Sequence, residues 1–203
     1  MKLITLEKAL YRRDLMVSRY GEGNNLLITY IENYRYFDEE QGAWVPHPDP
    51  TFETEWSYCT GNRGLLKCSE GNYVFFHTTV AEHHRRFITA YFVIKDVGLG
   101  REIVPRYNLV SPARHAEEIE DHYVIVGDEK LSRKMREPGL RFDRPLAERL
   151  VFDPPKRIRF DVTNRLGRRL SELECIASAT RKIRILTDED VKMVLLEINR
   201  SGL

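Results

Sequence analysis

The clearest hydrophobic pattern consists of two apolar runs, residues 73–78 and 87–97, that are rich in aromatic and β-branched side chains. Such residues favour the pleated, half-buried surface of a β-sheet. The link between the runs, residues 79–86, is short, polar and basic, so the runs predict a hairpin with a basic loop. Shorter apolar runs predict three further strands, at residues 26–31, 122–127 and 157–162.

The C-terminal part of the chain has the spacing of helices. Ser171 begins a Ser-Glu-Leu-Glu capping box, in which Glu174 reaches back to the helix start. A second helix opens after Thr187 with three acids, which suit a helix N-terminus. Its apolar residues lie on one face: Val191, Val194, Leu195 and Ile198. Residues 3–17 also have a roughly helical spacing. These patterns predict an α+β fold, a curved mixed sheet of five or six strands with flanking and C-terminal helices.

The chain has 203 residues, enough for one domain with its own core. We expect a single domain over residues 1–203, with a β core at 20–130 and a basic, turn-rich segment with a C-terminal helical appendage at 131–203. Residues 38–54 contain three closely spaced prolines, which predict an irregular excursion because proline blocks both helix and ladder hydrogen bonds.

Cysteine usage and hydropathy indicate a cellular setting. The three cysteines cannot all pair with one another, and no Cys-x-x-Cys occurs, which favours reduced thiols in a cytoplasmic protein: Cys59, Cys68 and Cys175. The N-terminus lacks the apolar core of a signal peptide. No run of about 18 apolar residues occurs, so we expect no membrane span.

Trp56 lies on a short polar loop that also carries Gly61. An indole in such a loop can stack on a nucleobase, which contributes about 1–3 kcal/mol per base. The neighbouring hydroxyl, amide and guanidinium groups can contact a base edge or a phosphate. The candidate base-binding residues are Trp56, Ser57, Tyr58, Thr60, Asn62, Arg63, His77 and a second indole, Trp44. The alternative is that Trp56 and Tyr58 are core aromatics and His77 is a structural residue.

Three segments resemble the PUA-like superfamily: Trp-Ser-Tyr-Cys-Thr at 56–60, Gly-Asn-Tyr-Val-Phe-Phe-His-Thr at 71–78 and Ile-Thr-Ala-Tyr-Phe-Val-Ile at 88–94. They are similar to its EVE and YTH branches and to the nucleotide-modification-associated domain of the second type. The resemblance covers residues 26–97. It implies a small PUA-like β-barrel with a pocket for an extruded, often modified base. It also implies that Trp56 is a wall of an aromatic cage and that Ser57, Thr60, Asn62 and Arg63 are edge or backbone contacts.

Basic residues are concentrated in one part of an otherwise neutral chain. Residues 133–169 contain twelve Lys or Arg against five acids, whereas the whole chain has 32 and 31. A local basic excess is typical of a phosphate-contacting face, although a solvated surface with ion pairs is the alternative. The candidate phosphate-binding residues are Arg85, Arg86, Arg181, Lys182 and Arg184.

Enzyme motifs are scarce. The chain has no phosphate loop, no Gly-x-Ser-x-Gly elbow and no His-Glu-x-x-His. Asp128 and Lys130 follow a predicted strand, as in a metal-dependent nuclease, but the second acid then has to come from the irregular loop at Asp49. We therefore expect a binding module for DNA or RNA without cofactor or metal, working beside a modification or restriction enzyme. The alternatives are a nuclease and a protein-interaction domain that uses the C-terminal helices.

Overall fold

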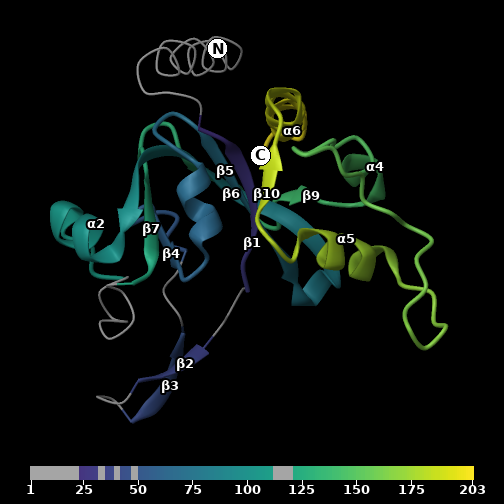
Figure 1. Ribbon diagram of the computed structural model, residues 1–203, viewed down its shortest axis with the longest axis horizontal. Coiled ribbons are helices and arrows are strands. Elements are labelled where there is room, and N and C mark those ends of the chain that lie inside the picture. Colours follow the sequence, from purple (N-terminus) through teal and green to yellow (C-terminus); the bar gives the residue numbers. More distant parts are fainter. Residues whose placement is uncertain (1–22, 32–34, 39–41, 47–49, 112–120) are drawn as a thin grey trace.

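The computed structural model describes residues 23–31, 35–38, 42–46, 50–111 and 121–203. Within them the fold is mixed α+β, with an open eight-stranded sheet and four α-helices (Figure 1). The predicted helix at residues 3–17 lies outside the described residues. The expectation of an α+β fold is therefore confirmed, but the sheet has eight strands rather than five or six, and it is not closed into a barrel.

The sheet is built around a central group of three strands. Strand β1 (Asn25–Thr29) pairs in parallel with β5 (Tyr73–Val80), and β5 forms an antiparallel hairpin with β6 (Arg85–Leu99) through the 3₁₀ turn η2 (Ala81–His83). The remaining strands are antiparallel: β10 (Arg184–Leu186) on β1, β7 (Tyr123–Gly127) on β6, β4 (Ser57–Thr60) on β7, and β8 (Arg133–Lys134) and β9 (Leu140–Arg141) on β6.

Strand β6 gives the sheet its bend. Its first half pairs with β5 and its second half with β7, and the register with β7 shifts between Ile94 and Asp96. An irregularity of this kind kinks a strand and increases its twist. Figure 1 shows the strands curling around the 3₁₀ helix η1 (Arg63–Lys67), which contacts β6 and β7. The strands β2 (Arg35–Asp38) and β3 (Ala43–Pro46) form a separate ribbon.

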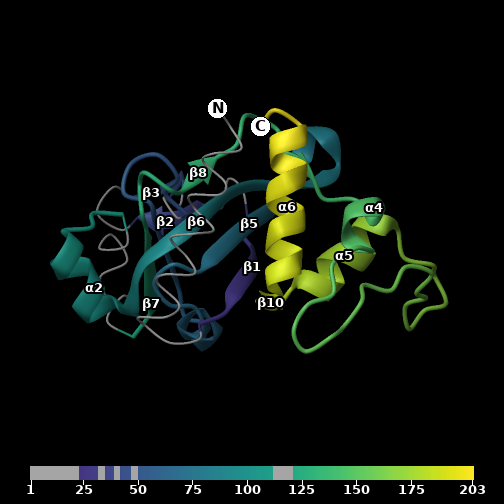
Figure 2. The ribbon, with the colours of Figure 1, turned by 90° about the horizontal axis from the view of Figure 1, so that it is seen from above.

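Each face of the sheet packs against a different partner because side chains alternate along a strand. Leu27, Phe75 and Ile88 belong to a core that also contains apolar residues of α5 (Glu172–Thr180) and α6 (Asp188–Arg200). The helix α4 (Arg144–Ala147) adds to the same layer, and Figure 2 shows α4, α5 and α6 gathered on one side of the sheet. The opposite, inner face carries Val74, Phe76 and Phe92 beneath η1.

The sequence predictions for individual elements have a mixed outcome. The strands at 26–31, 73–78, 87–97 and 122–127 are confirmed, as are the capping box at Ser171, the helix start after Thr187 and the buried face of α6. The strand at 157–162 is wrong, because no described strand pairs with it. The segment nevertheless alternates in burial, since Ile158 and Phe160 are buried whereas Arg157 and Arg159 are exposed. The helix α2 (Gly100–Tyr107), β4 and the ribbon within the proline-rich region were not predicted.

Among the described segments, no helix combines the length and the apolar character that crossing a bilayer requires. All three cysteines are buried, and none of them is part of a disulfide in the described residues.

Candidate functional site

The inner face of the sheet carries a cluster of six aromatic rings. Two of them, Phe76 and Phe92, are fully buried with ring centroids 4.7 Å apart. Four partly exposed rings surround this pair, and we call them the aromatic rim: Tyr30, Phe52, Trp56 and Tyr58. The rim rings pack edge-on against the buried pair at centroid distances of 5.3–6.4 Å. Packing therefore fixes four rings at the surface of one hydrophobic cluster.

Trp56 has an unusual backbone conformation for a large side chain. Its φ of 49° lies in the left-handed region, which costs a bulky residue on the order of 1–3 kcal/mol. Its carbonyl accepts a 2.8 Å hydrogen bond from the Gly127 N–H, and its ring packs edge-on against Phe92 at 5.7 Å. The local strain is thus sustained by the edge of the sheet, and strained residues of this kind gather at functional sites.

A cleft of about 410 Å³ opens beside the aromatic rim. Tyr30 and Phe52 form its aromatic wall, and η2 and β8 contribute polar side chains that include Glu82 and Lys134. The Tyr30 hydroxyl lies 2.9 Å from the Thr89 hydroxyl, and this hydrogen bond orients the ring. The volume is within the range of about 300–1,000 Å³ that is usual for small-ligand sites. Trp56 does not line this cleft, but it packs on the same buried ring as Phe52.

The structure separates the residues predicted from the Trp56 loop. Ser57 is fully buried and its hydroxyl lies 3.0 Å from the hydroxyl of Thr51, a geometry that does not fit direct contact with a base. The Thr60 hydroxyl accepts a hydrogen bond from the Asn62 N–H, and the Asn62 side chain caps η1 by accepting from the Gly64 N–H at 2.9 Å. Asn62 and Arg63 are exposed, but they follow the end of β4 while Trp56 precedes its start.

His77 and Arg86 lie inside the protein rather than at a ligand surface. His77 is fully buried, and its Nδ1 accepts a 3.2 Å hydrogen bond from Arg86 Nε. Its Nε2 lies 2.9 Å from the hydroxyl of Thr29, which donates to the carbonyl of Thr180. Burial lowers the pKa of Arg86 to about 10 and, together with the charge of Arg86, lowers the pKa of His77 well below its ordinary value. This internal network corrects the expectations that His77 contacts a base and Arg86 a phosphate.

The other predicted contact residues belong to several different segments of the chain. Trp44 pairs with Phe37 in the β2–β3 ribbon, and its side chain lies outside the described residues. Arg85 is exposed at the start of β6. Arg181 and Lys182 are exposed in the turn after α5, and Arg184 lies on β10. Of the five predicted phosphate contacts, Arg86 is therefore buried, and the other four come from the start of β6, the turn after α5 and β10.

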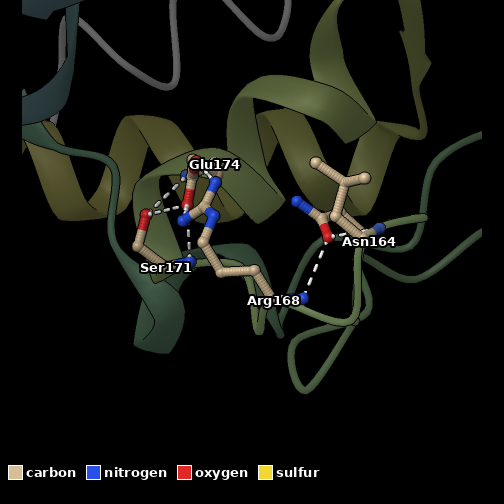
Figure 3. Close-up of polar contacts among 5 residues, drawn as sticks. Asn164, Arg168, Ser171 and Glu174 are labelled. Atoms are coloured by element: carbon tan, nitrogen blue, oxygen red, sulfur yellow. Dashed lines mark hydrogen bonds and ion pairs between the residues drawn. The ribbon is translucent and has the colours of Figure 1, made fainter.

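Half of the basic residues between 133 and 169 take part in ion pairs. Six of the twelve do so within the described residues: Lys134, Arg141, Arg144, Arg149, Arg168 and Arg169. Figure 3 shows one of these pairs, in which the Arg168 guanidinium binds the Glu174 carboxylate that also completes the capping box of Ser171. Ion pairing therefore accounts for part of the basic excess, and the remaining cations are the ones relevant to an anionic partner.

The features behind the two alternative functions have structural explanations. The Asp128 carboxylate accepts hydrogen bonds from the N–H groups of Lys130 and Leu131, so it stabilises the turn after β7. Asp49, the second acid of the nuclease hypothesis, lies outside the described residues. Across the segments that are described, no group of three His, Cys, Asp or Glu has the arrangement of a metal site. The C-terminal helices, which a partner protein was expected to bind, bury their apolar faces against their own sheet.

Comparison with protein-family models, with curated proteins and with solved structures finds no match for this chain. The site must therefore be argued from its own geometry. Sequence reasoning missed Tyr30 and Phe52, which line the cleft. The sequence does show that Tyr30 is an aromatic residue at a strand end and that Phe52 is one in a proline-rich loop. Only the curl of the sheet, however, brings these two rings close to Trp56.

Proposed function

We propose that this protein binds nucleic acid through a PUA-like sheet left open at its edges, and holds one extruded base against the aromatic rim. The observation that carries the proposal is the rim itself, four partly exposed rings fixed on two buried phenylalanines. Each nucleobase offers a flat π face, so aromatic side chains bind bases with about 1–3 kcal/mol of stacking. The resemblance of residues 26–97 to PUA-like modules adds support for an extruded, modified base.

The surroundings of the rim suit a planar ligand with polar edges. The adjacent cleft combines the aromatic wall of Tyr30 and Phe52 with Glu82 and Lys134, which can donate to or accept from the edge of a heterocycle. Asn62 and Arg63 are exposed in the chain that follows Trp56. Extruding a base costs a few kcal/mol and costs least at a damaged or mismatched pair, which gives a binding module selectivity without chemistry.

The test uses the intrinsic fluorescence of Trp56. The chain has two tryptophans, so a Trp44→Phe variant leaves Trp56 as its single indole. Oligonucleotides of one sequence, with and without a single modified base, are titrated into this variant at two salt concentrations. We expect saturable quenching of Trp56 that is stronger for one base. Trp56→Ala removes this fluorophore, so its affinity is measured from the anisotropy of a fluorescently labelled oligonucleotide, where we expect a loss of about five- to a hundredfold.

A matched control separates stacking from general damage. Tyr107 is a half-buried aromatic residue on α2 that packs in a different cluster, so Tyr107→Ala should leave oligonucleotide affinity unchanged. The proposal is refuted by titrations in which no base alters Trp56 fluorescence. It is equally refuted if Trp56→Ala and Tyr107→Ala reduce affinity to the same extent and in proportion to their loss of stability.

A further inference from the structure

A second cleft, of about 710 Å³, lies between the chain at residues 155–162 and helix α5, on the helical side of the sheet. Its charged lining is entirely cationic and consists of Lys156, Arg157, Arg159 and Arg184, and its other lining residues are neutral. We call it the cationic cleft. None of these four side chains forms an ion pair in the described part of the chain. Within the described residues, the cleft therefore gathers basic side chains that form no ion pair with a carboxylate.

Local packing turns two of these arginines outward. Ile158 and Phe160 are buried in the helical core, and Arg157 and Arg159, which alternate with them, are exposed. In an extended chain, residues two apart lie about 6.6 Å from each other on the same side. The hydrophobic anchors thus leave both arginine side chains on the exposed side of this segment. A phosphodiester strand also presents its charges at regular intervals.

Arg184 is held in position by contacts within the protein. Its Nε donates a 2.5 Å hydrogen bond to the carbonyl of Ala179, near the end of α5. Its guanidinium carbon lies 5.9 Å from the centroid of the Phe152 ring, within the usual range of a cation–π contact. Because these contacts restrict the side chain before any ligand arrives, binding an anion costs Arg184 little conformational entropy.

Two acids close in sequence to the cleft residues are bound to other arginines. Asp161 pairs with Arg169. Glu174 pairs with Arg168 and accepts from Ser171, as Figure 3 shows. These pairs stabilise the loop at 163–169, in which Asn164 also accepts from the Arg168 N–H, without placing a carboxylate in the lining of the cleft. The loop and α5 therefore form a fixed border beside uncompensated positive charge.

We propose that the cationic cleft binds the phosphates of a nucleic-acid backbone, at a site separate from the aromatic rim. This inference rests on the proposed function only for the identity of the polymer. A membrane surface fits less well, because interfacial binding needs exposed apolar side chains next to the cations. Here Val162 and Leu170 in the lining are half-buried, and the exposed large apolar side chains beside the cleft are only Val151 and Leu166 among the described residues, too few for an apolar face. A phosphodiester strand requires only the cations and space for the sugars.

The experiment uses an oligonucleotide without bases, so that stacking on the rim contributes nothing. The full chain is titrated with a fluorescently labelled abasic deoxyribose-phosphate strand between 50 and 200 mM salt. Single-strand binding has a log–log salt slope of about 0.7 per phosphate contacted, so Arg157→Ala with Arg159→Ala should reduce the slope by about 1.4. Raising the salt from 50 to 200 mM should therefore weaken binding by this double variant about sevenfold less than it weakens binding by the unchanged protein.

The control removes the same charge elsewhere. Arg101 on α2 and Lys192 on α6 are exposed cations outside the cleft, so Arg101→Ala with Lys192→Ala should leave the slope nearly unchanged. Equal slopes for the two double variants would overturn the proposal. The proposal would also be overturned if the unchanged protein bound the abasic strand too weakly to measure. It would likewise be overturned if the protein bound phosphatidylserine vesicles instead, and did so through Arg157 and Arg159. Because the probe has no bases, this result does not depend on whether Trp56 recognises a base.

Discussion

Acidification should destabilise this protein through a single buried histidine. The ring of His77 is fully buried and makes three described contacts, with Thr29, Arg86 and the edge of Phe142. Burial in the core and the positive charge of Arg86 lower the pKa of His77 well below its ordinary value of 6.5. Because Arg86 Nε donates to Nδ1, the network assigns the proton to Nε2, and the folded protein holds a neutral imidazole.

The size of the effect follows from proton linkage. Below pH 6.5 the unfolded chain protonates His77, whereas the folded protein does not, so the unfolded state binds more protons. The contribution of His77 to the free energy of unfolding is therefore fully present above about pH 6.5. Below that pH it falls by up to about 1.4 kcal/mol for each pH unit. If the folded ring stays neutral to pH 5, the loss there is about 2 kcal/mol, a large share of a typical 5–15 kcal/mol.

The measurement is urea denaturation at several pH values between 7.5 and 5, on the unchanged protein and on His77→Gln. Glutamine does not titrate, so the unchanged protein should lose about 2 kcal/mol more than the variant across this range. Carboxylates elsewhere affect both proteins equally. His84→Gln is the control, because it makes the same replacement at an exposed histidine. Parallel pH curves for the unchanged protein and His77→Gln would refute the neutral, buried imidazole.

Two further predictions concern backbone conformation. Because Trp56 has a φ of 49°, Trp56→Gly should be about 1 kcal/mol more stable to urea than Trp56→Ala, and a reversed order would contradict the left-handed conformation. At Gly139, with φ +97°, an added Cβ would lie 2.4 Å from the carbonyl oxygen of Ile88, whereas at Gly167, with φ +77°, it would have no neighbour within 4 Å. Gly139→Ala should therefore lower the thermal midpoint clearly more than Gly167→Ala, for which strain alone predicts about 1–2 kcal/mol.

Much of the fold follows from local sequence signals. The hairpin of β5 and β6 and the capped starts of α5 and α6 were predictable because their apolar spacing and capping residues act within a few positions. The segment at 157–162 alternates like a strand, yet pairing requires a neighbour with a free edge, and that depends on the rest of the fold. Local pattern therefore predicted its burial correctly and its hydrogen bonding incorrectly.

The candidate site was less predictable, for the same physical reason. Trp56 lies just before β4, but Ser57 turns inward because side chains alternate along β4, and its hydroxyl meets that of Thr51. Arg86 lies one position beyond exposed Arg85, and that single step changes a surface cation into a partner of His77. Arg184 reaches the cationic cleft only because β10 pairs with β1, a contact between distant parts of the sequence.

The position of β1 has a consequence for how this protein can be shortened. One side of β1 bonds to β5, and among the described strands its other side is covered by β10 alone, from almost 160 residues later. A truncated chain that stops before β10 exposes the ladder edge of Asn-Leu-Leu-Ile-Thr, a short apolar template on which other copies can add. The C-terminal strand β10 is thus needed to cover β1. During synthesis, nearly the whole described chain must be translated before β1, the first described strand, is protected.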